Sequence, residues 1–179
     1  MPRRLLLQDA CVLINLVASG RFEDMAREGG YQFIVARAAC DEALYIRDAL
    51  TGDPVPIELA PYFTAGLLEI IDAETEEERA SYVAYTTLLD DGEAMSLALA
   101  EARHLVLATD DRKARALIVR ESIEVELSST IGVLQAWEKA AGIEKSEMSQ
   151  ILARIQKCAR FAPAAGHPDR GWWDARTDT

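Results

Sequence analysis

LVLATDDRKAR, residues 105–115, joins a predicted strand to a predicted helix through two adjacent acids. Its first five residues form a short, mostly apolar run, which is typical of a fully buried strand. Asp110 and Asp111 follow at once, and apolar residues recur at helical spacing from Ala114 onward. Ligands of α/β sheets bind at the carboxyl ends of the strands, so this acid pair is a candidate metal or catalytic site. Asp is also a favoured helix cap, which leaves a purely structural role open.

Three further acids occupy comparable places in other segments. Asp9 follows a predicted strand at 5–7, and Glu93 lies in the first turn of a helix predicted from residue 90. Glu42 borders the apolar face of a helix predicted over 37–50, where an unpaired carboxylate is unfavourable. Asp9 could instead be an N-cap, and Glu93 could belong to a capping box. Acids that come from four separate segments nevertheless favour a shared functional site.

The rest of the chain alternates between strand and helix patterns without an internal repeat. This alternation predicts a mostly parallel sheet with helices on both faces. Strands are expected at 5–7, 31–36, 66–73, 105–109 and 123–127. Helices are expected at 10–20, 22–30, 37–50, 74–89, 90–104, 110–121, 128–140 and 145–161. A Pro-rich loop is expected at 51–61, and an irregular tail at 162–179 that contains Trp172 and Trp173.

Composition limits the possible functions. The 179 residues fit one domain, and no apolar run is long enough for a membrane span. Asp9 and Asn15 interrupt the apolar N-terminal stretch, so we do not interpret it as a signal peptide. Three widely spaced cysteines predict neither a disulfide framework nor a zinc site, which favours a cytoplasmic location. The net charge of −11 argues against nucleic-acid binding through a broad basic face.

Four segments of the chain together resemble the PIN domain, and especially the VapC-like toxin ribonucleases. They lie within residues 5–140, and their order and spacing agree with that family. The segments are LLLQDACVLINL, ARAACDEAL, DDGEAMSLALA and LVLATDDRKAR. The resemblance implies a three-layer α/β/α sandwich with a parallel sheet in the order 3-2-1-4-5. The first and fourth strands would then be neighbours, with their acids side by side at the switch point.

The resemblance assigns the family's acidic quartet to Asp9, Glu42, Glu93 and Asp111, with Asp110 as an additional metal-binding acid. Asp9 and Asp111 are expected to bind Mg²⁺ or Mn²⁺ directly, since these hard cations prefer oxygen ligands. Glu42 and Glu93 are expected to bind the ion through water or to orient the attacking water.

Residues around the acids complete the expected site. Arg112 and Lys113 are candidates for holding RNA phosphates, whereas Arg115 fits an ordinary solvated helix face slightly better. Cys11 stands where many members of the family carry Ser, Thr or Asn two residues after the first Asp. This departure affects a supporting hydrogen bond rather than a metal ligand.

The predicted activity is therefore metal-dependent hydrolysis of RNA by an endoribonuclease, in which the protein is the toxin of a toxin–antitoxin pair. An antitoxin partner and a homodimer are expected from the resemblance alone. Two alternatives stay open: a PIN-like protein that binds partners without cleavage, and a Mg²⁺-dependent phosphohydrolase. The chain is expected to divide into a nuclease domain at 1–140 and a C-terminal helix and tail at 141–179 that pack on it.

Overall fold

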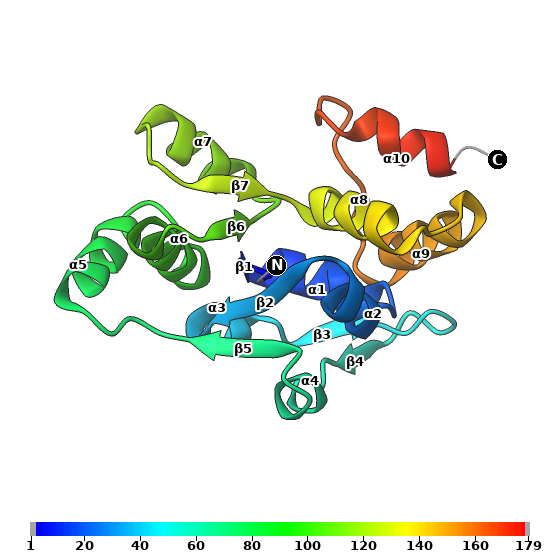
Figure 1. Ribbon diagram of the computed structural model, residues 1–179, viewed down its shortest axis with the longest axis horizontal. Helices are drawn as coiled ribbons and strands as arrows, with labels where there is room; N and C mark the ends of the chain where they lie inside the picture. The colour runs from blue at the N-terminus through cyan, green and yellow to red at the C-terminus, as the bar shows by residue number, and fades with distance from the viewer. Residues whose placement is uncertain (1–2, 178–179) are drawn as a thin grey trace.

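A five-stranded parallel sheet forms the centre of the computed structural model, which describes residues 3–177 (Figure 1). Its strands run in the spatial order β5 (Leu68–Ile71), β2 (Tyr31–Ala36), β1 (Arg4–Gln8), β6 (Val106–Ala108) and β7 (Glu126–Ser128). All neighbouring strands pair in parallel. In chain order of the sheet strands this is 3-2-1-4-5, which confirms the predicted topology.

Helices cover both faces of the sheet. In Figure 1, α5 and α6 lie on one side, and α1, α2, α8 and α9 lie on the other. The central strands are buried between these layers: Leu6, Leu7 and Leu107 are at most 2% exposed. The predicted α/β/α architecture is therefore confirmed. The helices are α1 (Ala10–Ala18), α2 (Phe22–Glu28), α3 (Arg37–Glu42), α4 (Ala60–Thr64), α5 (Glu76–Tyr85), α6 (Asp91–Arg103), α7 (Arg112–Arg120), α8 (Thr130–Ala141), α9 (Lys145–Cys158) and α10 (Arg170–Thr177).

The prediction of a helix over 37–50 is wrong for the second half of that range. Helix α3 ends at Glu42, and the chain continues into a two-stranded antiparallel sheet of β3 (Tyr45–Arg47) and β4 (Pro54–Pro56). The turn between these strands is stabilised locally, because the Asp48 carboxylate accepts the backbone N–H groups of Leu50 and Thr51. Leu50 is 92% exposed, although the helical pattern placed it on the buried face.

The Pro-rich stretch and the C-terminal tail also contain regular structure that the sequence did not predict. The expected loop at 51–61 includes β4 and the beginning of α4. The expected irregular tail at 162–179 includes α10. Residues 178 and 179 lie outside the described part of the chain.

Helix α10 is anchored on the body of the protein by its aromatic and charged side chains. Trp173 is 2% exposed and packs edge-on against Phe161. Trp172 donates its indole N–H to Glu138 of α8 at 3.1 Å. Arg176 makes two hydrogen bonds to the same carboxylate and lies over the Trp172 ring. The two indoles therefore pack on the rest of the chain rather than projecting into solvent.

A buried ion pair connects α5 to α6, the helix that carries Glu93. Glu78 is 4% exposed, and its carboxylate accepts two hydrogen bonds from Arg103 at 2.6 and 3.0 Å. The same carboxylate accepts the backbone N–H groups of Glu74 and Thr75 at the start of α5. Both oxygens of the buried Glu78 carboxylate therefore have hydrogen-bond donors. No helix within residues 3–177 has the length and hydropathy of a membrane span.

Candidate active site

All five acids named from the sequence line one hollow, which we call the acid site. It has a volume of about 390 Å³ and is lined by Asp9, Glu42, Glu93, Asp110 and Asp111. The fold explains this convergence, because β1 and β6 are adjacent parallel strands whose carboxyl ends lie at the same sheet edge. The backbone N–H of Asp9 donates to Ala108 O of β6 at 3.1 Å, which joins the two strand ends.

Asp9 is the most buried of these acids, with 3% of its surface exposed. Its carboxylate caps α1 by accepting the Val12 backbone N–H at 2.9 Å. Burial raises the pKa of Asp9 to about 6, and the nearby Asp110 contributes to the rise, although the hydrogen bonds oppose it. An ionised carboxylate at this position is therefore costly unless a cation accompanies it.

The Cys11 thiol supplies the supporting hydrogen bond that the sequence left open. Its Sγ donates to Asp9 Oδ1 at 2.9 Å. Burial raises the pKa of the thiol well above its usual range, and the Asp9 and Asp110 carboxylates raise it further. The sulfur therefore keeps its proton and can act only as a weak donor, in place of a hydroxyl or amide.

Asp110 is fixed by polar groups from two helices on the same side of the sheet. It accepts hydrogen bonds from Asn15 Nδ2 at 3.1 Å, from Thr130 N at 3.0 Å and from the Thr130 hydroxyl. Asn15 also donates to the Thr130 hydroxyl at 3.0 Å. Burial raises the pKa of Asp110, while these hydrogen bonds lower it. Within residues 3–177, the carboxylate is thus positioned beside Asp9 by neutral hydrogen-bond donors.

Asp111 has a different environment from its neighbour. Its Oδ1 caps α7 by accepting the backbone N–H groups of Lys113 and Ala114 at 2.7 and 2.8 Å. The backbone N–H of Asp111 donates to the Thr109 hydroxyl oxygen at 3.1 Å. Asp110 and Asp111 both face the acid site, and which of them is the main metal ligand stays a prediction.

Glu42 and Glu93 enter the site from the side of α6. Glu42 Oε1 accepts the Gly92 backbone N–H at 2.9 Å, so the last residue of α3 stabilises the start of α6. Glu93 accepts the Asp90 N–H at 3.4 Å, a long contact within the predicted capping box. Burial raises the pKa of Glu93, and the charge of Asp111 raises it further. Glu93 and Asp111 therefore repel each other electrostatically across the hollow.

The capping and functional interpretations of these acids are compatible. The carboxylates of the site accept N–H groups at the starts of α1, α6, α7 and α8. Each helix start carries a partial positive charge, which offsets part of the repulsion among the acids. The helix starts therefore help to hold the carboxylates close together.

The donor set fits a hard divalent cation. No lysine or arginine among residues 3–177 lines the acid site, so carboxylate oxygens dominate its chemistry. Within the same residues, no three His, Cys, Asp or Glu side chains are already arranged as a metal-binding group. Mg²⁺ keeps several waters and commonly uses only one or two carboxylates, so its binding does not require a preformed cage of ligands. The site has room for such a hydrated ion.

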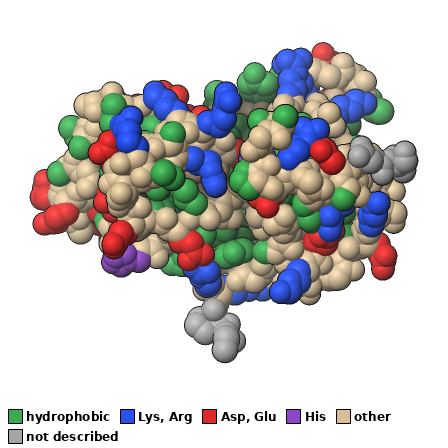
Figure 2. All heavy atoms as spheres, turned by 90° about the horizontal axis from the view of Figure 1, so that it is seen from above, with side chains coloured by type: hydrophobic (Ala, Val, Ile, Leu, Met, Phe, Trp, Pro, Cys, Tyr) green, Lys and Arg blue, Asp and Glu red, His purple; other side chains and the backbone are tan. Residues whose placement is uncertain are grey.

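Basic residues adjoin the acid site on the Asp110 side, in a second hollow that we call the α7 pocket. It has a volume of about 680 Å³ and is lined by Asp110, Arg112, Arg115 and residues of the segment 161–168. Figure 2 shows Lys and Arg side chains spread across the face of the molecule seen from above. Arg112 is exposed and lines the α7 pocket, and its contact with RNA stays a prediction. Lys113 is exposed, and its charge lowers the pKa of Glu93, which places it nearby.

Arg115 differs from the solvated residue that the sequence favoured. Its Nη1 donates to Thr109 O at 3.0 Å and to Ser128 O at 2.8 Å, which ties the ends of β6 and β7 together. Its side chain is only partly exposed.

Sequence reasoning missed three residues that position the acids. Asn15 and Thr130 hold Asp110, and Gly92 holds Glu42. A signal for Asn15 was present, because a polar residue in an otherwise apolar helix needs a buried partner. Gly92 also carried a signal, since glycine disfavours a helix without a packing reason.

Gly92→Ala tests whether the position of Glu42 matters. A Cβ at residue 92 would lie 2.5 Å from Glu42 Oε2, so the carboxylate must move away. The fold should tolerate this, because only the end of a flexible side chain is displaced. We expect a loss of metal-dependent cleavage of roughly 10²-fold, since misplacing a site group by about 1 Å can cost that much. Thermal unfolding should change little; equal activity in Gly92→Ala and wild type would contradict a role for Glu42.

A parallel sheet whose central strands end in clustered carboxylates defines an α/β protein with a candidate metal site at the carboxyl ends of its strands. A family model of the PIN domain matches residues 5–165, and the chain belongs to the PIN domain family. PIN domains are generally nucleases and typically use divalent metal ions. Comparison with curated proteins gave no match, and comparison with solved structures gave none either.

Proposed function

We propose that this PIN domain is a Mg²⁺- or Mn²⁺-dependent endoribonuclease. The observation that carries the proposal is the acid site itself, in which five carboxylates from four segments meet in one hollow without a basic side chain of residues 3–177. Packing this much negative charge together is costly, and a divalent cation relieves the cost. No His base or Cys nucleophile is needed for such chemistry.

The predicted roles follow from the surroundings of each acid. Asp9 would hold the cation together with Asp110 or Asp111, because these carboxylates follow adjacent strands. Glu42 and Glu93 would bind through water or orient the attacking water from the α6 side. A bound Mg²⁺ or Mn²⁺ lowers the pKa of a water molecule and stabilises negative charge on the phosphodiester. Arg112 and Lys113 would hold RNA phosphates beside the acids.

The finer biological assignment rests on the VapC-like resemblance. We propose that the protein acts in the cytoplasm as the toxin of a toxin–antitoxin pair, restrained by an antitoxin, and that it forms a homodimer. The three cysteines support a reducing compartment, because none of them is in a disulfide.

The test is cleavage of a mixed pool of single-stranded and structured RNA with Mg²⁺, with Mn²⁺ and with EDTA. We expect cutting with either metal, none with EDTA, and a large loss in Asp111→Asn. Thermal unfolding with and without the metal reports binding independently, since a ligand of the folded state raises its stability. A folded protein that binds the metal but cuts no RNA in the pool would contradict the proposal and favour a non-catalytic, partner-binding role.

A further inference from the structure

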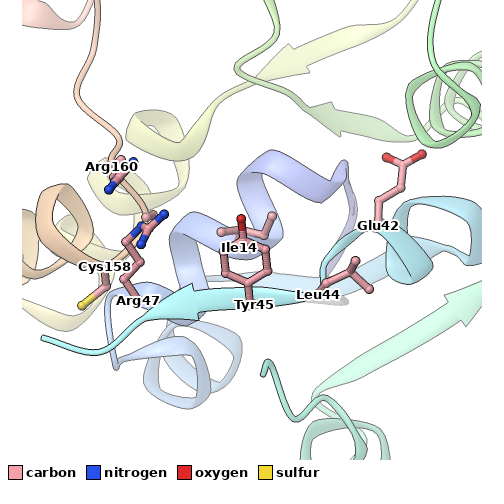
Figure 3. A pocket seen from close by; sticks show the side chains of 8 residues that line it. Ile14, Glu42, Leu44, Tyr45, Arg47, Cys158 and Arg160 are labelled. Carbon is pink, nitrogen blue, oxygen red and sulfur yellow. The ribbon is translucent and has the colours of Figure 1, made fainter. Parts of the chain in front are cut away.

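A third hollow adjoins the acid site at Ile14 and Glu42. It has a volume of about 400 Å³, and its lining includes Tyr45 and Arg47 of β3 and Arg160 of the segment after α9. We call it the arginine pocket. Ile14 and Glu42 line both this pocket and the acid site, so the two hollows are neighbours. Figure 3 shows Glu42 at one end of the pocket, Tyr45 in the middle, and both arginines at the other end.

The two arginines bring positive charge to the end of the pocket that lies away from Glu42. Arg47 donates through Nη1 to Gly52 O at 3.0 Å, a neutral carbonyl. Neither arginine makes an ion pair with any residue in the range 3–177, and Arg160 makes no side-chain hydrogen bond there either. Two guanidinium groups at the same end of a pocket form a site for an anion with several oxygens.

Arg160 is also held in an unusual backbone conformation. It follows the C-cap Ala159 of α9 and has φ of +56°. This is the position where helices commonly end with glycine, because a side chain is disfavoured in the left-handed region. Local strain of this kind is often found at functional sites. The turn itself does not require an arginine, because His104 and Ser122 adopt the same conformation at the ends of α6 and α7.

We propose that the arginine pocket is a phosphate-binding subsite for single-stranded RNA, which holds the strand as it leaves the acid site past Glu42. This inference rests on the proposed function, since it identifies the substrate path of the same site. Tyr45 is 50% exposed and lies between Glu42 and the arginines. Its ring offers a surface on which an unpaired base can stack. One nucleotide would then place its base on Tyr45 and its phosphate on Arg47 and Arg160.

The decisive variants are Arg160→Gly and Arg47→Ala, with Lys157→Ala as the matched control. Lys157 is exposed on the last turn of α9 and does not line the pocket, so its loss removes one positive charge without changing the pocket lining. The affinity for a labelled single-stranded RNA decamer is measured by fluorescence anisotropy in EDTA, at several salt concentrations. We expect each arginine variant to bind roughly tenfold more weakly. The slope of log affinity against log salt should fall by roughly 0.7 for each lost phosphate contact.

Two further measurements separate binding from folding. Arg160→Gly should unfold at the same temperature as wild type or higher, because glycine suits the left-handed conformation. Tyr45→Ala should weaken RNA binding without changing the salt slope, since stacking releases no counterions.

The outcomes distinguish this inference from the nuclease assignment. If the wild type cuts RNA but both arginine variants keep its affinity and salt slope, the subsite proposal is wrong and the proposed nuclease activity is upheld. If the arginine variants lose affinity as expected but the wild type cuts no RNA with metal, the arginine pocket is an RNA-binding site and the proposed nuclease activity is wrong. An equal loss in Lys157→Ala would overturn the subsite, because a net-charge effect would explain the result. A wild-type protein that does not bind the decamer would also overturn the subsite proposal.

Discussion

Asp9→Asn should abolish metal-dependent RNA cleavage, with a loss of roughly 10³-fold or more. The substitution removes the charge that would bind the cation, and a metal ion contributes several kcal/mol to stabilising the transition state. Asn keeps the shape of the side chain and can still accept the Val12 N–H that caps α1. The loss should therefore come from chemistry rather than from misfolding. Cleavage rates of purified wild type and variant with Mg²⁺ measure the effect.

The same substitution should have the opposite effect on stability. The pKa of Asp9 is raised from 3.8 to about 6, which corresponds to roughly 3 kcal/mol against the ionised form in the folded state. Because the folded-state pKa lies above the unfolded value, this group's contribution to stability is present below about pH 4. It is lost as the pH rises through about 6. Asp9→Asn should thus be up to roughly 3 kcal/mol more stable than wild type at neutral pH in EDTA.

Thermal unfolding between pH 4 and pH 8 in EDTA checks this prediction. The wild type should lose stability across that range through Asp9, and the variant should show a flatter profile. Adding Mg²⁺ should stabilise the wild type but not the variant. The control is Asp41→Asn, which removes the same charge from an exposed position outside the acid site. A variant that still cuts RNA at the wild-type rate would show that Asp9 is only a helix cap.

Glu78→Ala should destabilise the fold by about 3 kcal/mol at neutral pH. It leaves Arg103 without its carboxylate partner between α5 and α6, and removing one member of a buried pair is strongly destabilising. It also removes the acceptor of two N–H groups at the start of α5. For a domain of this size, the melting temperature should fall by roughly 6–12 °C. Glu77→Ala is the control, because Glu77 is exposed and immediately precedes Glu78 in the same helix.

This effect should depend on pH in a defined direction. The hydrogen bonds that the Glu78 carboxylate accepts from Arg103 lower the pKa of Glu78 from 4.5 to about 2. The stabilisation is therefore fully present above about pH 4.5 and is lost as the pH falls through 2. Denaturant unfolding of wild type and Glu78→Ala at pH 7 and at pH 2.5 should show the difference shrinking at the lower pH. A difference that is equal at both values would mean that packing, rather than charge, explains the loss.

The sheet and the convergence of the acids could be predicted because they depend on patterns within short segments. Apolar runs identified β1 and β6, and the resemblance to PIN domains implied that these strands are neighbours. Asp9 and Asp111 were therefore expected side by side at the carboxyl ends of these strands, and both line the acid site together with Asp110. The supporting contacts could not be predicted in this way. Asn15 and Thr130 are 115 residues apart in sequence, and only the folded chain shows that they share the Asp110 carboxylate.

The failures also have physical causes. The pattern over 37–50 kept helical spacing by coincidence, while the Asp48 turn and the pairing of Ile46 with Val55 decided the local structure. The tail was expected to be irregular because of its Pro and Gly content. Its second half forms α10, since Trp172 and Trp173 gain burial and a hydrogen bond by packing on the body. Tertiary contacts outweighed local propensity in both places.

The segment between α9 and α10 contributes to the lining of both the arginine pocket and the α7 pocket. A ribosome synthesises this segment after every acid of the site, because Asp111 precedes Cys158 by more than forty residues of the chain. A nascent chain therefore carries its carboxylates before it has the surfaces that flank them. Evolution can also alter these flanking surfaces near the C-terminus without changing the acids at the centre.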